Sequence, residues 1–86
     1  MSKVVIYTRG YCPYCDRAKA LFDKLGVAYQ EINMDDATPE QIQAMIEKSG
    51  GRRTVPQIFI NGKPIGGFDD LSVLQQSGKL NDLLND

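Results

Sequence analysis

The sequence predicts an α/β fold built on one mixed four-stranded sheet flanked by helices, and three observations lead to this prediction. First, short apolar runs alternate with stretches of helical periodicity in the order β-α-β-α, which is typical of parallel β-α-β units. Second, two further short runs flank Asn61-Gly62, a strong signal for a type I′ hairpin. Third, 86 residues are enough for one core and too few for two, so we expect a single domain over residues 1–86.

The first half of the chain contains the expected parallel unit. Residues 3–7 form a short apolar run that we interpret as a buried strand. Residues 13–25 carry apolar side chains at helical spacing, and Gly26 is the expected stop. Residues 27–32 are rich in β-branched and aromatic side chains, which favours a second strand. A right-handed crossover through the helix then makes the two strands parallel.

A second helix is expected to begin at Pro39. Thr38 precedes it as the N-cap, and Gln41 completes a capping box in which each side chain bonds to the other residue's backbone. Gly50 and Gly51 end this helix. Its predicted buried stripe comprises Ile42, Met45 and Ile46.

The remaining elements are a hairpin and a third helix. Residues 57–60 and 63–66 are the hairpin strands, and Pro64 places the second strand at an edge of the sheet because proline cannot donate to a ladder. Asp69 or Asp70 is expected to cap the third helix. The last expected features are Gln76 as the end of this helix, Gly78 as its stop, and a short amphipathic turn with Leu80, Leu83 and Leu84.

Composition excludes several functions. The chain has 10 basic and 11 acidic side chains and a net charge of −1, so nothing attracts it to nucleic acid or to an anionic membrane. It has no histidine, which removes histidine-activated nucleophiles, and its two cysteines cannot complete a zinc site. Its start resembles neither a signal peptide nor a membrane span. We therefore expect a cytoplasmic monomer that binds no metal, no nucleic acid and no membrane.

The sequence Cys12-Pro13-Tyr14-Cys15 lies where the first strand leads into the first helix. Proline at the first helical position makes Cys12 the N-cap, where free amide groups and the helix dipole favour a thiolate. Cys15 follows one turn later, close enough to attack a mixed disulfide formed at Cys12. A structural disulfide here would contribute only about 2 kcal/mol and would tie together nothing that the helix does not already hold. The spacing therefore favours a redox pair over a structural disulfide.

Charged neighbours modify this expectation. Asp16 lies in the same first turn and disfavours a thiolate at Cys12 by like-charge repulsion. Arg9 and Arg17 are available to offset that repulsion. Asp16 and Arg9 each also have a purely structural interpretation. Asp16 stabilises a helix N-terminus, and Arg9 is equally suited to be a solvated surface charge.

Two further motifs make the chain resemble a known family. Together with the cysteine pair, Thr54-Val55-Pro56 and the glycine-aspartate run at positions 65–70 are similar to glutaredoxins over nearly the whole chain. The resemblance implies a thioredoxin-like fold, a cis peptide bond before Pro56, and reduction of disulfides with glutathione. It implies glutathione as co-substrate without a tightly bound cofactor, and disulfide-containing or glutathionylated proteins as the other partners.

The resemblance also implies where glutathione binds. The peptide is expected to add antiparallel to Val55, next to Pro56, through main-chain hydrogen bonds. Gly66 and Gly67 allow close backbone approach, and the free amides at the start of the third helix, from Phe68 onward, are expected to bind the γ-glutamyl carboxylate. The ammonium group is assigned to one of the two aspartates that follow, whose alternative role is capping alone.

The other expected contacts come from basic and aromatic side chains. Arg9 and Arg53 are assigned to the glycyl carboxylate, Arg53 beside Thr54, whereas Arg52 is expected in solvent. Tyr14 either packs over the glutathione chain or is only an exposed aromatic residue at a helix start. The expected glutathione site thus comprises Arg9, Tyr14, Arg53, Thr54, Val55, Pro56, Gly67, Phe68, Asp69 and Asp70, with Cys12 and Cys15 as the catalytic pair.

The chain departs from the family pattern at Phe68, where many members have a further cysteine, and two other functions stay open. One is a redoxin reduced by thioredoxin reductase, against which the expected glutathione site argues. The other is an iron–sulfur carrier that joins Cys12 of two chains through a cluster with two glutathiones. Pro13 argues against a cluster by stiffening the loop, and Cys15 does so by offering a competing disulfide.

Overall fold

The computed structural model describes residues 3–85, so the predicted domain over residues 1–86 includes three residues outside this part. The elements, in chain order, are β1 (Val4–Thr8), α1 (Pro13–Lys24), β2 (Gln30–Asn33), α2 (Pro39–Lys48), β3 (Gln57–Ile60), β4 (Lys63–Gly66), α3 (Phe68–Ser77) and α4 (Lys79–Leu84). The strands form one sheet in the order β2-β1-β3-β4. Strands β1 and β2 are parallel and the other pairs antiparallel, which confirms the predicted mixed sheet.

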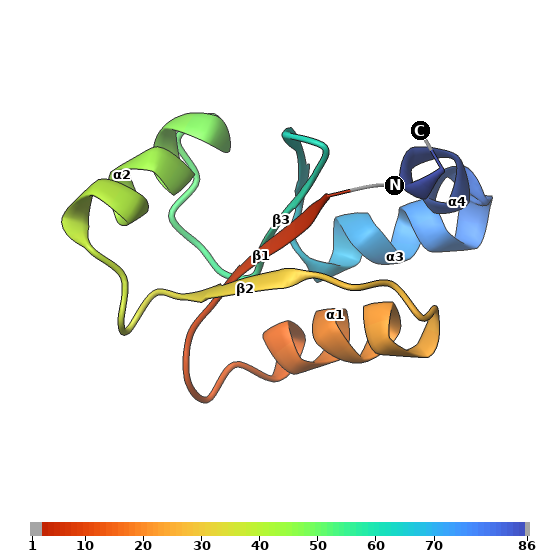
Figure 1. Ribbon diagram of the computed structural model, residues 1–86, viewed down its shortest axis with the longest axis horizontal. Helices are drawn as coiled ribbons and strands as arrows, with labels where there is room; N and C mark the ends of the chain where they lie inside the picture. The colour runs from red at the N-terminus through yellow and green to blue at the C-terminus, as the bar shows by residue number, and fades with distance from the viewer. Residues whose placement is uncertain (1–2, 86) are drawn as a thin grey trace.

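Helices cover both faces of this sheet, and Figure 1 shows α2 well apart from the other three helices. The alternation of side chains along β1 explains the two layers, because successive residues of a strand point to opposite faces. Val4 and Ile6 pack with buried residues of α1, α3 and α4, whereas Tyr7 packs with Met45 of α2. Among the described residues, no helix is both long and apolar enough to cross a membrane.

Strand β2 is shorter than predicted, since it begins at Gln30 and not at Val27. The Val27 N–H donates to the Phe22 carbonyl oxygen at 2.9 Å, which holds this segment in the turn that follows α1. Val27 and Tyr29 nevertheless pack against the core. Their apolar character therefore reflects burial of a connecting segment, which a sequence pattern does not distinguish from a strand.

The second helix begins as predicted. The Gln41 N–H donates to Thr38 Oγ1 at 3.2 Å, and the Thr38 N–H donates to Gln41 Oε1 at 2.9 Å, which confirms the capping box. Met45 is fully buried, while Ile42 and Ile46 are half-buried. Met45 and Ile46 pack with residues of β1 and β3, so this part of the predicted stripe is the face that α2 turns to the sheet.

The hairpin also follows the prediction, but the cap of α3 does so only in part. Asn61 and Gly62 have φ values of 53° and 81°, the two positive values that a type I′ turn requires. The N-cap of α3 is Gly67, so neither aspartate occupies the N-cap position, and the predicted aspartate cap is confirmed only for the Asp70 side chain. Asp70 instead reaches back from the first turn, and its Oδ2 accepts from the Gly67 N–H at 3.0 Å.

The end of the chain matches the expected pattern closely. Helix α3 ends at Ser77, one residue later than predicted, and Gly78 follows with a φ of 81°. The predicted amphipathic turn is α4, in which Leu80 is buried. This helix closes one end of the core around α1 and α3.

Candidate active site

The two cysteines form a disulfide at the start of α1, with their Cα atoms 5.2 Å apart. Cys12 is the N-cap with extended backbone, and Pro13 occupies the first helical position, as the sequence predicts. Cys15 lies in the first turn and is 1% exposed, whereas Cys12 is only half-buried. A substrate in solvent can therefore reach Cys12, whereas Cys15 is shielded from solvent.

The helix start acts directly on the Cys12 sulfur. The Cys15 N–H donates to Cys12 Sγ at 3.2 Å. This amide is one of the groups at a helix N-terminus that have no partner within the helix, and it carries part of the positive end of the dipole. In the reduced protein the same contact favours negative charge on the Cys12 sulfur, which is the reactive form of a thiol.

Lys19 lies between two carboxylates near this turn, those of Asp16 and Glu31. Its Nζ lies 3.7 Å from the Asp16 carboxylate and donates to Glu31 Oε2 at 3.1 Å. Thr8 Oγ1 donates to the same Glu31 oxygen at 2.6 Å. The hydrogen bond from Thr8, followed by that from Lys19, lowers the pKa of Glu31, and the bond to Glu31 raises the pKa of Lys19. Lys19, which the sequence analysis did not single out, is therefore a cation held next to Asp16.

Among residues 3–85, the ion pair to Asp16 comes from Lys19 and not from Arg9 or Arg17, the two arginines expected to offset its charge. The Arg17 guanidinium is 5.2 Å from the centre of the Tyr14 ring, a cation–π arrangement. Arg9 is exposed.

The signal that would have identified Lys19 as the partner of Asp16 is its spacing, because residues three apart on a helix are neighbours.

The segment before β3 lies beside the attacking sulfur. The Val55–Pro56 bond is cis, as the family resemblance implies, and the Val55 carbonyl oxygen lies 4.0 Å from Cys12 Sγ. Gln57 is buried, and its Nε2 donates to Thr54 Oγ1 at 3.1 Å, which ties the segment to the sheet. Extended backbone is thus fixed next to Cys12.

A groove of about 230 Å³ runs along this segment. All the residues expected to bind glutathione line it except Arg9 and Arg53. Tyr14 and Phe68 lie together at the groove, with their ring centres 6.2 Å apart. The residues lining the groove are Tyr14, Arg52, Thr54, Val55, Pro56, Gly67, Phe68, Asp69 and Asp70.

Arg52 is exposed, as expected from the sequence, but it also lines the groove. Its Nη1 lies 3.7 Å from Asp70 Oδ2, and the Ser49 hydroxyl bonds to both the N–H and the carbonyl of Arg52. Arg53 is exposed and does not line the groove. Of these two neighbouring arginines, only Arg52 faces the groove. Nothing in the sequence indicates which one does.

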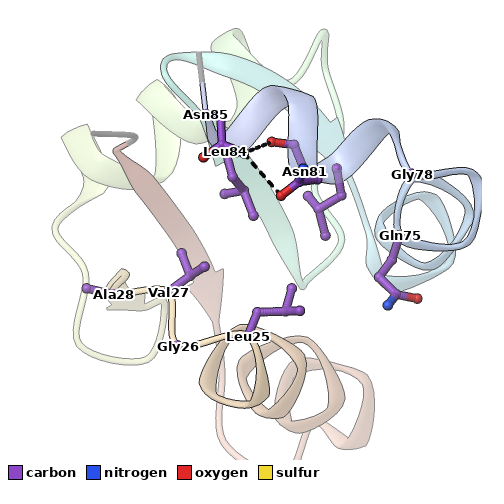
Figure 2. A pocket seen from close by; sticks show the side chains of 10 residues that line it. Leu25, Gly26, Val27, Ala28, Gln75, Gly78, Asn81, Leu84 and Asn85 are labelled. Atoms are coloured by element: carbon purple, nitrogen blue, oxygen red, sulfur yellow. Dashed lines mark hydrogen bonds between the residues drawn. The ribbon is translucent and has the colours of Figure 1, made fainter.

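A larger cavity, of about 590 Å³, lies near the C-terminal end of α1 and away from the cysteines. Figure 2 shows Leu84 of α4 pointing toward Leu25 and Val27 across it. Its lining is apolar or amide-bearing, with neither a thiol nor an ionisable side chain. The cavity therefore lacks the chemistry of the cysteine pair and is not part of this site.

The site has the three features that a thiol–disulfide oxidoreductase needs. Cys12 is accessible to a substrate, Cys15 is shielded from solvent, and a cis-proline segment adjoins Cys12. The protein is therefore a thiol–disulfide oxidoreductase with a thioredoxin-like fold.

Comparisons with known proteins give the family. The sequence model of the glutaredoxin family matches residues 4–65. The chain is 53% identical to Glutaredoxin 1 of Rickettsia typhi over 81 residues, which are 94% of this chain and 78% of that protein. It is 50% identical to Glutaredoxin 3 of Escherichia coli K12 over 84 residues, 98% of this chain and 99% of that protein. A crystal structure of a buckwheat glutaredoxin–glutathione complex superposes with a TM-score of 0.86 at 40% identity, covering 98% of this chain and 77% of the other. The chain therefore belongs to the glutaredoxin family.

Proposed function

We propose that this glutaredoxin reduces protein disulfides and glutathione mixed disulfides in the cytoplasm, as a monomer with glutathione as its co-substrate. The observation that carries the proposal is the position of the groove, which adjoins the Cys12 sulfur and offers extended backbone at Val55. The buckwheat relative, which forms a complex with glutathione, supports the same ligand here. No tightly bound cofactor enters the chemistry.

With a glutathione mixed disulfide, the reaction needs only Cys12. Its thiolate attacks the glutathione sulfur, a new disulfide forms between Cys12 and glutathione, and the protein sulfur leaves as a thiolate. A second glutathione thiolate then attacks the bound glutathione, forms oxidised glutathione and releases the Cys12 thiolate. The amide contact to Cys12 Sγ stabilises this leaving thiolate, and a stable leaving group speeds the second exchange.

With a protein disulfide, Cys15 is needed as well. Cys12 first becomes joined to one sulfur of the substrate, and the other sulfur leaves as a thiolate. The Cys15 thiolate then attacks Cys12 Sγ, releases the second substrate thiolate and forms the disulfide seen in the structure. Two glutathione molecules reduce this disulfide and leave as oxidised glutathione.

The groove accounts for the charged ends of glutathione. Helix α3 begins at its edge, and amides in a first turn bind carboxylates. Asp70 already accepts from the Gly67 N–H and faces Arg52, so we assign the ammonium group to Asp69. Arg52 adds a cation within the groove, and Arg9 and Arg53 are the remaining candidates for the glycyl carboxylate.

The proposal is tested with cysteine variants and two reductants. Cys12→Ser is expected to abolish turnover, and Cys15→Ser to retain reduction of glutathione mixed disulfides while losing most reduction of protein disulfides. Both are measured by coupling to glutathione reductase, with thioredoxin reductase as the alternative reductant. Activity of Cys12→Ser equal to that of the unmodified protein, or reduction by thioredoxin reductase alone, would overturn the proposal.

A further inference from the structure

Tyr11, the residue directly before Cys12, is held in an exposed and unfavourable conformation. Its side chain is 107% exposed, compared with 53% for Tyr14. Its φ of 55° is in the left-handed region, which bulky residues rarely adopt. Within residues 3–85 its ring has no aromatic, cationic or hydrogen-bonding partner. The ring therefore contributes nothing to the packing of the fold that would offset this conformation.

Contacts from outside Tyr11 hold the loop in place. The Gly10 N–H donates to Asp35 Oδ2 at 2.9 Å, and the Asp35 N–H donates to Asn33 Oδ1 at 2.8 Å. Gly10 has little room for a side chain, because a Cβ there would lie 3.2 Å from Asp35 Oδ2. These hydrogen bonds fix the loop after β1 against the loop after β2. The backbone position of Tyr11 therefore does not depend on its own side chain.

Tyr11 and Tyr14 stand in different relations to the groove. Tyr14 lines it, whereas Tyr11 does not. A glutathionyl group seated in the groove therefore leaves the Tyr11 ring free. A polypeptide joined to the reacting sulfur extends beyond the groove, and the exposed ring next to Cys12 is available to it. Aromatic side chains bury large areas at interfaces and are enriched among the residues that dominate binding.

We propose that Tyr11 determines preference for polypeptide disulfides, by packing its ring against apolar groups of the substrate chain while Cys12 attacks the substrate sulfur. The inference rests on the proposed reaction at Cys12 and adds a contact outside the glutathione groove. It makes Tyr11 a specificity residue, because the ring acts on the part of the substrate that small disulfides lack.

The test compares single-turnover oxidation of the reduced protein by two substrates without glutathione. Insulin supplies polypeptide disulfides, and bis(2-hydroxyethyl) disulfide is the small substrate. Tyr11→Asn is the informative variant, because asparagine adopts the left-handed region more readily than tyrosine and the fold is kept. Tyr11→Phe keeps the ring, and Val73→Asn removes another exposed apolar side chain, 64% exposed on α3, as a matched control.

We expect Tyr11→Asn to lower the rate constant toward insulin about five- to ten-fold and that toward the small disulfide by less than about two-fold. Tyr11→Phe and Val73→Asn are expected to match the unmodified protein, and the melting temperature of Tyr11→Asn to be unchanged or higher. Equal loss on both substrates, or no loss on insulin, would overturn the inference. Because no glutathione is present, failure of glutathione to regenerate the protein counts only against the proposed function.

Discussion

Arg52 Nη1 lies 3.7 Å from Asp70 Oδ2, and this ion pair fills the space that a side chain at Gly66 would need. The pair joins the segment before β3 to the first turn of α3 and forms one wall of the groove beside Cys12. Both side chains are about half exposed, so the pair itself contributes little to stability. Its importance is that it places a cation and an anion in a groove proposed to bind a zwitterionic peptide.

Replacing Arg52 is expected to weaken binding of glutathione. We expect Arg52→Ala to raise KM for glutathione about three- to ten-fold with little change in kcat, because a charge-assisted contact to the peptide is lost while Cys12 is untouched. The matched comparison is Arg53→Ala, which removes the same charge from a residue that does not line the groove and is expected to raise KM less than Arg52→Ala does. Steady-state kinetics with glutathione reductase measures both, and a larger effect at Arg53 than at Arg52 would contradict the placement.

A side chain at Gly66 is expected to destabilise the fold, because the Asp70 and Arg52 side chains would have to move away from it. The φ of Gly66 is 113°, and a Cβ there would collide with the Asp70 carboxylate and lie 2.9 Å from Arg52 Nη1. Gly66→Ala is expected to lower the free energy of unfolding by about 2–3 kcal/mol, and Gly50→Ala by about 1–2 kcal/mol. Gly50 is the control because its φ is also positive, at 78°, but nothing lies within 4 Å of its Cβ position. Equal losses in urea titrations would show that the collision is relieved without cost.

Asp16 is expected to oppose ionisation of Cys12 and Lys19 to moderate that effect. Removing the negative charge in Asp16→Asn favours the thiolate, so the pKa of Cys12 is expected to fall; removing the cation in Lys19→Met is expected to raise it. The rate of Cys12 alkylation against pH measures both shifts. Because the Asp16 side chain is 76% exposed, both should shrink at high salt. A shift in the same direction for the two variants would refute this account.

Glu31 is expected to make stability depend on pH at the acid side. Its pKa is lowered in the folded state by the hydrogen bonds from Thr8 and Lys19, so its contribution is present above the unfolded pKa, about 4.3, and is lost as pH falls through the folded value. Glu31→Gln is expected to cost about 0.5–1 kcal/mol at pH 7, a value reduced by the 35% exposure of the side chain.

The same variant gives the check on this linkage. In urea titrations the difference between Glu31→Gln and the unmodified protein should narrow below about pH 4. A difference that stays constant from pH 7 to about pH 3 would mean that the carboxylate charge contributes nothing. Lys19 gives the opposite pH dependence of stability. Because its pKa is raised in the folded state, its contribution to stability is lost only as pH rises through the folded value.

Local signals in the sequence were sufficient for much of this structure. The capping box of Thr38 and Gln41, the Asn61-Gly62 turn and the cysteine pair at a helix start each depend on residues within a few positions of one another. Most of the expected groove residues also belong to two short motifs, at positions 54–56 and 67–70. The residues of each motif lie close together in space because they are neighbours in the chain.

What the sequence did not predict depends on contacts between distant segments. Residues 27–29 look like a strand because they pack on the core, and only pairing with β1 decides where β2 begins. The choice of Arg52 over Arg53 depends on how the segment leaves Ser49 and reaches Asp70 on α3. The cap at Gly67 was missed because a glycine offers no side chain, and Asp70 acts from the third position of the helix.

The start of α1 is expected to activate Cys12 beside the groove that we propose binds glutathione. The most direct measurement is the rate of Cys12 alkylation in the reduced protein against pH, with and without S-methylglutathione. We expect an apparent pKa for Cys12 below the ordinary thiol value of about 8.5, together with slower alkylation when the analogue is bound. A pKa at the ordinary value with no protection by the analogue would contradict this expectation.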